Sequence, residues 1–321
     1  LSLSHIISII GSNVALLPPE TLSLSDSVST TAAHIVVLPT ETLSLVDVLS
    51  NDKSTEVAIV ESLLLREEYA SQPTNIVAMD TEINGLNGFN ELGIATGVDT
   101  FTLTGTYAGT YAIVVSQQDD SVTIIDVSNP SNIVEKDTET DGLNDFEQLD
   151  RPFGVDTFTL TGTYAGTYAI VTAFRDDGVQ IIDVSNPENI VAKDYLTDTD
   201  GAFLELDGAK GVDTFTIGAN TYAIVTAVND DGVQVIDVSN PENIVAKGYL
   251  TDDGTRTLDE ARDVKTFTID SKTYAIVVAV ADNGVQIIDV TNPESIIALS
   301  NLEDFDEHDR LNGAFDVEIF T

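Results

Sequence analysis

Alternating apolar and polar residues recur along most of the chain, and the spacing of an amphipathic helix is absent throughout. In residues 212–217 (VDTFTI), Val and Thr alternate with Asp, Phe and Ile, which is the period of two of a half-buried strand. Residues 221–227 (TYAIVTA) are largely apolar and β-branched, as in a strand buried on both faces. A glycine-containing turn and a proline then separate two further strands. Four strands are predicted in this unit, at residues 212–217, 221–227, 232–238 and 243–250.

The same four-strand pattern occurs four times in the chain. The phrase DVSNP begins at Asp126, Asp183 and Asp237 and returns as DVTNP at Asp289. The phrase TYAIV begins at Thr110, Thr167, Thr221 and Thr273. Four short antiparallel strands that repeat at a period of about 50 residues are typical of a β-propeller blade. A two-sheet sandwich is the alternative, but it requires no repeat, so the repetition favours the propeller.

Two of these units also resemble a known family. Residues 179–196 (VQIIDVSNPENIVAKDYL) and 233–250 (VQVIDVSNPENIVAKGYL) are similar to LVIVD repeats. The resemblance extends over about residues 55–321. It implies a β-propeller in a secreted or cell-surface protein of archaea or bacteria. It implies no reaction, because propellers host many unrelated functions.

The two ends of the repeat region predict how the ring closes. Residues 313–321 match only the first strand of a unit, whereas residues 55–82 match the second to fourth strands. We therefore predict an all-β fold with a five-bladed propeller of four-stranded antiparallel blades, the last blade combining both segments and placing Glu318 beside Ala58. Such closure leaves no open sheet edge. The alternative is that the chain is part of a larger ring.

Residues 1–53 follow a shorter pattern and are predicted to form a separate segment before the propeller at 54–321. The phrase LSL occurs at Leu1, Leu22 and Leu43, a period of 21 residues, and the alternation in residues 20–29 predicts a strand. The segment resembles Ser/Leu repeats in surface proteins of marine ammonia-oxidising archaea. It is interpreted either as a stalk of stacked β-strands or as a strand donor that pairs with a neighbouring subunit.

Charge narrows the classes of partner. The chain has 54 acidic and 13 basic residues and a formal net charge of −41. Such a surface repels nucleic acid and anionic membranes, so neither is predicted as a partner. It also repels itself, which cations relieve. The longest apolar stretches are far shorter than the ~20 residues that span a bilayer, so no membrane insertion is predicted. Cysteine is absent, which excludes disulfides. An extracellular or cell-surface location is expected for a chain that, beginning at Leu1, we interpret as processed or a fragment.

The acidic loops between units predict a Ca²⁺ site. Residues 80–91 place oxygen ligands at loop positions 1, 3, 5 and 12 and Gly85 at position 6, as a calcium loop requires. Two later loops keep part of this spacing. The predicted ligands are Asp80, Glu82, Asn84, Glu91, Asp137, Glu139, Asp141, Asp198 and Asp200. The alternative is that these residues only form polar turns.

Catalytic chemistry is not predicted. The three histidines lack a metal-ligand spacing, and the chain has no phosphate loop or nucleophile motif. The residues that follow a repeated valine are predicted either to form an acidic ring in the channel or to face solvent; they are Asp99, Asp156, Asp213, Lys265 and Glu318. Acidic pairs such as Asp230 and Asp231 recur in equivalent hairpins, which indicates a role in the turn.

These observations favour an extracellular structural or adhesive protein that is not an enzyme. It is expected to be a homo-oligomer or polymer that builds a surface layer or filament, or that contacts surface partners. The first alternative is a calcium-dependent module that binds a glycan, peptide or surface protein. The second is a secreted polysaccharide hydrolase or lyase with Asp213 in its site.

Overall fold

The computed structural model describes residues 13–15, 23–24, 34–36, 44–45, 79–85, 89–201, 204–303, 311 and 313–320. The chain divides into two compact units, residues 1–77 and 78–321. Helices in the described residues are single 3₁₀ turns, and none is long and apolar enough to cross a bilayer. The predicted boundary after residue 53 and most of segment 55–82 lie outside the described residues.

The described residues of the first unit form two pairs of parallel strands. β1 (Asn13–Ala15) pairs with β3 (His34–Val36), and β2 (Ser23–Leu24) pairs with β4 (Ser44–Leu45). Asn13 lies opposite His34, and Ser23 lies opposite Ser44, an offset of 21 residues in both pairs. The period of the sequence therefore equals the offset of the pairing, which places equivalent residues of successive repeats side by side.

The described residues of the second unit form four antiparallel sheets of four strands, each made of consecutive strands. The first sheet comprises β5 (Ala95–Leu103), β6 (Gly109–Ser116), β7 (Ser121–Asp126) and β8 (Val134–Thr140). The second comprises β9 (Pro152–Leu160), β10 (Gly166–Ala173), β11 (Gly178–Asp183) and β12 (Val191–Thr197). The third comprises β13 (Ala209–Ile217), β14 (Asn220–Ala227), β15 (Gly232–Asp237) and β16 (Val245–Thr251). The fourth comprises β17 (Ala261–Ile269), β18 (Lys272–Ala279), β19 (Gly284–Asp289) and β20 (Ile297–Glu303). The 3₁₀ turns are η2 (Gly105–Tyr107), η3 (Gly162–Tyr164) and η4 (Asp198–Asp200).

The all-β prediction is confirmed, together with the antiparallel four-stranded units. The described residues contain four such sheets rather than five, and residues 313–320 are not part of a sheet. The predicted first strands were too short. In the third sheet β13 begins at Ala209 instead of Val212, because a bulge between these residues lets the pairing with β14 continue. Alternation alone could not show this, since a bulge interrupts the period of two.

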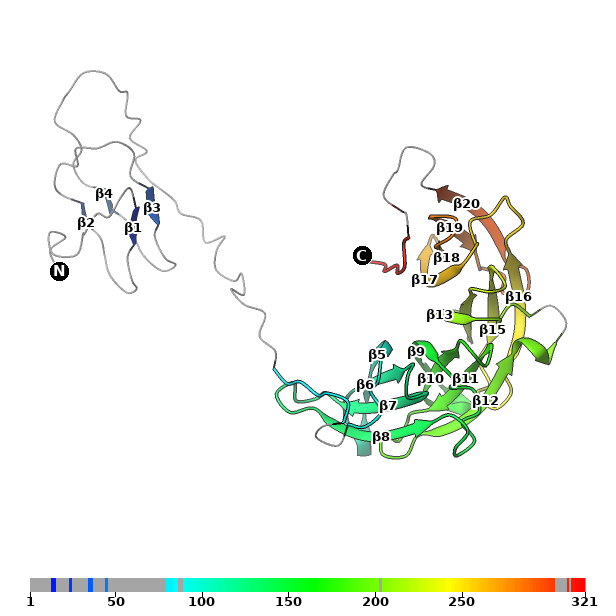
Figure 1. Cartoon of the computed structure of the whole chain (residues 1–321), viewed down its shortest axis with the longest axis horizontal. Coiled ribbons are helices and arrows are strands. Elements are labelled where there is room, and N and C mark those ends of the chain that lie inside the picture. Colours follow the sequence, from blue (N-terminus) through cyan, green and yellow to red (C-terminus); the bar gives the residue numbers. More distant parts are fainter. Residues whose placement is uncertain are drawn as a thin grey trace, which may run out of the picture. The chain divides into compact units, whose positions relative to one another are not determined.

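The four sheets follow one another around an arc, with β5, β9, β13 and β17 on its inner side (Figure 1). Three apolar clusters join consecutive sheets, and each joins two different faces. One sheet contributes a stacked Phe–Tyr pair, such as Phe158 and Tyr168 with ring centroids 5.8 Å apart. The next sheet contributes Ala, Val and Ile side chains, such as Ala223 and Val225. Every sheet therefore has an aromatic face and an aliphatic face, and the core lies between unlike faces.

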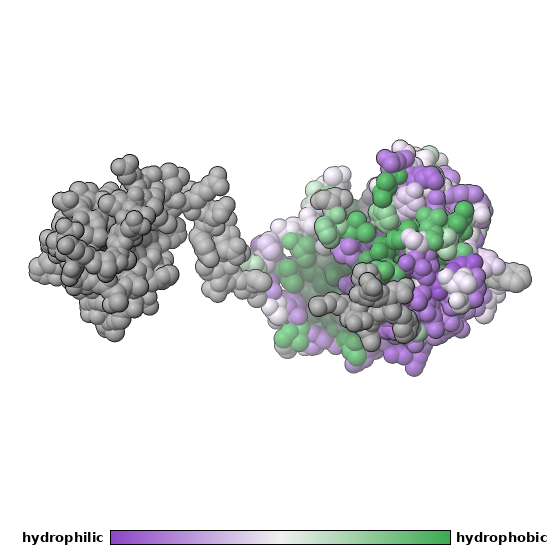
Figure 2. Space-filling model, turned by 90° about the horizontal axis from the view of Figure 1, so that it is seen from above, coloured by the Kyte–Doolittle hydropathy of each residue, from purple (hydrophilic) through white to green (hydrophobic). Residues whose placement is uncertain are grey.

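The outermost faces of the arc are less completely covered. In the fourth sheet the aromatic face carries the stacked pair Phe267 and Tyr274, but both residues are only half-buried, and Ile269 beside them is 54% exposed. In the first sheet Val98, on the innermost strand, is 65% exposed. Figure 2 shows hydrophobic residues around a hollow in this unit. The two end faces are thus of the unlike kinds that pack together within the arc.

Candidate functional site

The acidic hairpin turns hold each sheet to its neighbour. The first residue of each turn accepts a hydrogen bond from a backbone N–H in the segment that leads into its own sheet, as Asp176 Oδ2 does from Asp150 N at 2.8 Å. The second residue accepts one from the entry to the next sheet, as Asp177 Oδ1 does from Gly208 N at 3.0 Å. The equivalent second-residue bonds run from Arg151 N to Asp120, from Glu260 N to Asp231 and from Gly313 N to Asn283. The second residues adopt positive φ angles of 47–52°. The predicted role in the turn therefore extends to a link between units.

The predicted channel residues form a second set of links. Asp99 accepts hydrogen bonds from the backbone N–H and side-chain hydroxyl of Thr157 on the next inner strand, at 2.8 and 2.5 Å. Asp156 and Asp213 make the same pair of bonds to the following sheets. Asp213 also lies 3.0 Å from Lys265 Nζ. These carboxylates lie on inner strands, and they bind protein donors there. Burial, with smaller effects of Asp213 and Asp99, raises the pKa of Asp156 to about 6.

In the first predicted calcium loop, two of the four ligands hold backbone groups. Asp80 Oδ2 accepts a hydrogen bond from Ile133 N at 2.8 Å, and Asn84 Oδ1 accepts one from Leu92 N at 3.1 Å. Glu82 is partly exposed, and Glu91 contributes its backbone carbonyl to the hydroxyl of Ser121 at 3.1 Å.

The later loops repeat this arrangement. Asp137 Oδ2 accepts from Ile190 N at 2.7 Å, and Asp141 Oδ1 accepts from Leu149 N at 3.0 Å. Glu139 accepts from the amide of Asn144 at 2.8 Å. In the third loop Asp198 accepts from Leu206 N at 3.4 Å, and Asp200 accepts from both the backbone and the hydroxyl of Thr197 in a capping box.

Asp80 and Asp137 therefore stand at equivalent positions and hold a backbone N–H of the next sheet, a role that Asp194 rather than Asp198 has in the third loop. Asp198 stands instead at the position of Asn84 and Asp141, and these three residues hold their own loops. Within the described ranges, no group of three or more acidic or histidine side chains is arranged to hold a metal ion. Calcium binding stays a prediction. Acidic side chains are crowded around Asp176, the first residue of its hairpin turn. Burial, and after it the charges of Asp141, Asp150 and Asp120, raises the pKa of Asp176 to about 6, against a lowering by the hydrogen bond from Asp150 N.

A further group of side chains, not identified from the sequence, gathers where the inner strands begin. Thr96, Phe153, Lys210, Arg262 and Phe315 occupy the same position in consecutive units, two residues before the repeated valine. Lys210 Nζ lies over the ring of Phe153, 4.6 Å from its centroid, and the guanidinium of Arg262 lies over the ring of Phe315 at 4.5 Å. Such contacts hold the cations against aromatic faces. We call these five residues the axial row.

Phe174, at the end of β10, extends this group on one side. Its ring packs edge-on against Phe153 with centroids 5.7 Å apart and lies 5.0 Å from Lys210 Nζ. Arg151 approaches the same ring at 5.7 Å. Burial, and after it the charge of Arg262, lowers the pKa of Lys210 to about 8.

The axial row borders a cavity of about 500 Å³ at the inner strands. We call it the axial cavity. Its walls also contain the backbone at Gly97, Gly154 and Gly211 and the acidic residues Asp263 and Asp316. A side chain at Gly154 would lie 2.3 Å from the carbonyl oxygen of Lys210, so the inner strands approach too closely for any residue but glycine. Burial and a hydrogen bond with Asp316 raise the pKa of Asp263 to about 7.

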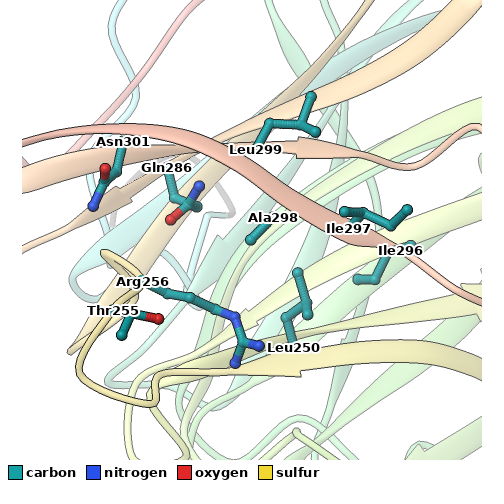
Figure 3. Close-up of a pocket in the computed structure, with 9 residues that line it drawn as sticks. All are labelled: Leu250, Thr255, Arg256, Gln286, Ile296, Ile297, Ala298, Leu299 and Asn301. Atoms are coloured by element: carbon teal, nitrogen blue, oxygen red, sulfur yellow. The ribbon is translucent and has the colours of Figure 1, made fainter.

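A second cavity, of about 360 Å³, lies farther out between the third and fourth sheets (Figure 3). Ile297 and Leu299 of β20 lie on one side of it, and Arg256 reaches in from the loop after β16. Arg256 is committed to that loop, because it donates to the carbonyl of Thr251 and pairs with Asp253 at 3.2 Å. This cavity therefore has an apolar wall and no free cation among its described lining residues.

The family comparison matches the same units. The LVIVD repeat matches residues 107–140, 164–197, 221–252 and 272–303. The chain carries four LVIVD repeats. Each LVIVD repeat covers the second, third and fourth strands of one sheet, and the inner strands fall between the matched segments. The axial row therefore lies outside the LVIVD repeats.

Comparison with curated proteins finds no match. Among solved structures, the chain is similar to a protein from Lactobacillus plantarum, at 14% identity and a TM-score of 0.46, with 65% of this chain and 55% of that chain covered. It is also similar to a structure titled as a putative 6-phosphogluconolactonase from Bacteroides uniformis, at 15% identity, a TM-score of 0.46 and the same coverage. The chain thus spans about half the length of these structures.

Proposed function

We propose that this protein is an extracellular structural or adhesive protein that assembles into a surface layer or filament, or that mediates surface contacts. In this proposal, the LVIVD-repeat unit is carried on the 21-residue repeat of the first unit. The observation that carries the proposal is the in-register parallel pairing of β1 with β3 and of β2 with β4 at an offset of 21 residues.

Parallel stacking of a short repeat favours assembly because the backbone groups at the two ends of the stack have no hydrogen-bond partners within it. Each coil of such a stack pairs with the coil before it and the coil after it. The outer edge of the first and last coils then offers unpaired backbone groups to another chain or to further repeats. A head-to-tail contact of this kind extends into a filament unless its rotation closes a ring.

The distribution of carboxylates supports a role without catalysis. An active site requires groups that one unit has and the others lack. Here the acidic residues of the turns, the loops and the inner strands make equivalent hydrogen bonds in successive sheets, as Asp99 and Asp156 do. Their repetition is accounted for by the joining of sheets. The net charge of −41 fits a protein that works among abundant cations outside the cell.

The proposal includes a fifth blade built from the two ends of the repeat region. At one end, Asp80 accepts from Ile133 N in the way that Asp137, within the fourth strand β8, accepts from Ile190 N, which supports a fourth strand of a preceding blade around residue 80. At the other end, Gly313 N donates to Asn283 and Val317 N donates to Asp263. Residues 313–317 thus lie where the first strand of a following blade would begin.

Calcium is the second element of this proposal, as a stabilising ion for the loops between blades. Burial, and after it the charges of Asp141, Asp150 and Asp120, raises the pKa of Asp176, and a divalent cation would relieve the repulsion between these carboxylates.

Assembly is tested with proline in the repeat segment. Ile35→Pro removes a backbone N–H from β3, whereas Ile35→Val keeps it and serves as the matched control. We expect electron microscopy of the purified chain to show polymers for the native and Ile35→Val proteins and dispersed particles for Ile35→Pro. Polymers of unchanged length in the proline variant, or a native chain that stays monomeric at high concentration, contradict the proposal.

A further inference from the structure

The residue type of the axial row changes from unit to unit, unlike that of the repeated valine on the same inner strands. The valine two residues later is present in each unit, at Val98, Val155, Val212, Val264 and Val317. The axial row instead contains a threonine, two phenylalanines, a lysine and an arginine. Residues that the packing between sheets requires recur in every unit. The residues of the axial row do not recur, so this packing does not determine them.

The two cations of the axial row, Lys210 and Arg262, are incompletely paired with carboxylates among the described residues. Of the six lysines in the described residues, five lie within 4.0 Å of a carboxylate; these five are Lys136, Lys193, Lys247, Lys265 and Lys272. For Lys210 no carboxylate lies at that distance among the described residues. Arg262 pairs with Glu260 through one terminal nitrogen, but its Nε is buried without a hydrogen-bond partner there. Buried donors without partners are costly, and in a chain of 54 acidic residues the lack of a partner for Lys210 calls for a reason.

The backbone holds these two cations in place. Thr172 Oγ1 donates to the carbonyl of Lys210 at 2.5 Å, and Thr226 Oγ1 donates to the carbonyl of Arg262 at 3.0 Å. Both threonines are fully buried at the end of the second strand. The aromatic rings of Phe153 and Phe315 contact the charged ends of the two side chains. A site organised in this way binds without first ordering its own residues.

The cavity is also lined by the acidic residues Asp263, Asp316 and Glu318, but none of them lies within 4.0 Å of Lys210 Nζ or the Arg262 guanidinium among the described residues, and Glu318 accepts from Ile319 N at 3.0 Å. Lys265 is neutralised by Asp213, and Asp263 accepts from Val317 N at 2.9 Å while it lies against Asp316. A shared proton between Asp263 and Asp316 would leave a carboxyl group able to bond a hydroxyl. The ring of Phe315 is 60% exposed, which gives the cavity a flat apolar surface beside its cations.

We propose that the axial cavity binds a sugar acid, with the carboxylate of a uronate between Lys210 and Arg262 and its ring against Phe315. A volume of about 500 Å³ lies in the range of small-ligand pockets, ~300–1,000 Å³. Charge-assisted hydrogen bonds hold the carboxylate, and the phenyl ring packs against the apolar face of the sugar. This site is separate from the repeat segment that the proposed assembly uses, so either proposal can fail alone.

The test is calorimetric titration of the full chain with D-galacturonate and with neutral D-galactose. We expect galacturonate to bind and galactose not to bind. Lys210→Met and Arg262→Met, which keep an apolar side chain over the rings, should each weaken binding about 10-fold, the effect of a charge-assisted hydrogen bond of ~1.5 kcal/mol. Lys193→Met, on the outer strand β12, is the matched control and should bind like the native chain. A linear trimer of galacturonate shows whether a polysaccharide unit or the free acid is preferred.

A second measurement does not depend on the variants folding. Limited acetylation of the native chain at pH 8, followed by peptide mass analysis, should modify Lys210 first, and galacturonate should protect that lysine while galactose does not. Equal binding of galactose and galacturonate, galacturonate affinity unchanged in Lys210→Met, or no protection of Lys210 would overturn the proposal.

Discussion

At the scale of single residues, the molecule uses aspartate as a connector. One oxygen of a turn or inner-strand aspartate reaches a backbone N–H of the next unit, 31 residues away for Asp177 and Gly208 and 58 residues away for Asp99 and Thr157. Such bonds are geometrically specific, but they bring carboxylates into regions that lack water. Burial therefore raises the pKa of several acidic groups, to about 6 for Asp156 and Asp176 and to about 7 for Glu205 and Asp263.

These shifts predict how stability depends on pH. A carboxyl group whose pKa is raised in the folded state binds more protons folded than unfolded between its two pKa values, so the free energy of unfolding falls as pH rises through that range. We expect the protein to be more stable at pH 5 than at pH 8 in denaturant titrations at constant salt. Glu205→Gln should stabilise the protein at pH 8 and flatten this dependence by at most about 1.4 kcal/mol per pH unit.

Glutamine is the natural residue at the equivalent position of the preceding unit, Gln148, so the Glu205→Gln substitution fits the fold. Glu147→Gln, at an exposed position, removes the same charge and should leave the pH dependence unchanged. Stability that rises from pH 5 to pH 8 would show that these groups are not desolvated as described.

At the scale of strands and loops, the sequence predicted the elements better than their connections. The TYAIV segments and the DVSNP breaks identified the second and third strands, because burial on both faces and proline act locally. The first strands extend past the predicted start through bulges, as at Ala209 in β13, and no local pattern marks a bulge. The axial row escaped the sequence analysis because its members stand 52–57 residues apart and belong to four different residue types. Its one signal was the break in the repeat at Phe153, Lys210 and Arg262.

The loops between blades give a prediction for calcium. If the crowded loop binds Ca²⁺, excess Ca²⁺ raises the melting temperature relative to chelator, since a ligand at 100 times its Kd stabilises by ~2.7 kcal/mol. Asp141→Asn should abolish that shift, because it removes a charge and keeps the acceptor for Leu149 N, as Asn84 does for Leu92 N. Asp145→Asn, an exposed change in the same loop, should retain it. Identical melting curves in calcium and in chelator would exclude a stabilising ion.

At the scale of the whole molecule, the two end faces of the arc are the least covered of the sheet faces. Phe267 and Tyr274 at one end are the counterparts of residues that are buried in the other three sheets. A blade that carries residues 55–82 and 313–321 would cover both ends in one chain.

A designed disulfide tests this closure. In the third sheet Thr214 lies opposite Ala223, and the repeat places Ile319 and Ala58 at these positions. This register makes Ile319, rather than the adjacent Glu318 predicted from the sequence, the expected partner of Ala58. The chain has no cysteine of its own, so Ala58→Cys with Ile319→Cys introduces a single possible pair. We expect an oxidised monomer that migrates faster than its reduced form in a denaturing gel. Each single substitution is the control and should give no such species. A ladder of disulfide-linked multimers would mean that a neighbouring chain supplies the missing strands.

The unlike faces of each sheet have a consequence for how this architecture changes over generations. At each junction between sheets the aromatic face of one sheet packs against the aliphatic face of the next. The aromatic face of any sheet therefore fits the aliphatic face of any other. Tandem gain or loss of one repeat in the gene therefore inserts or removes a whole four-stranded sheet and leaves an aromatic face packed against an aliphatic face at every contact. Related chains should differ in the number of four-stranded sheets more readily than in the order of strands within a sheet.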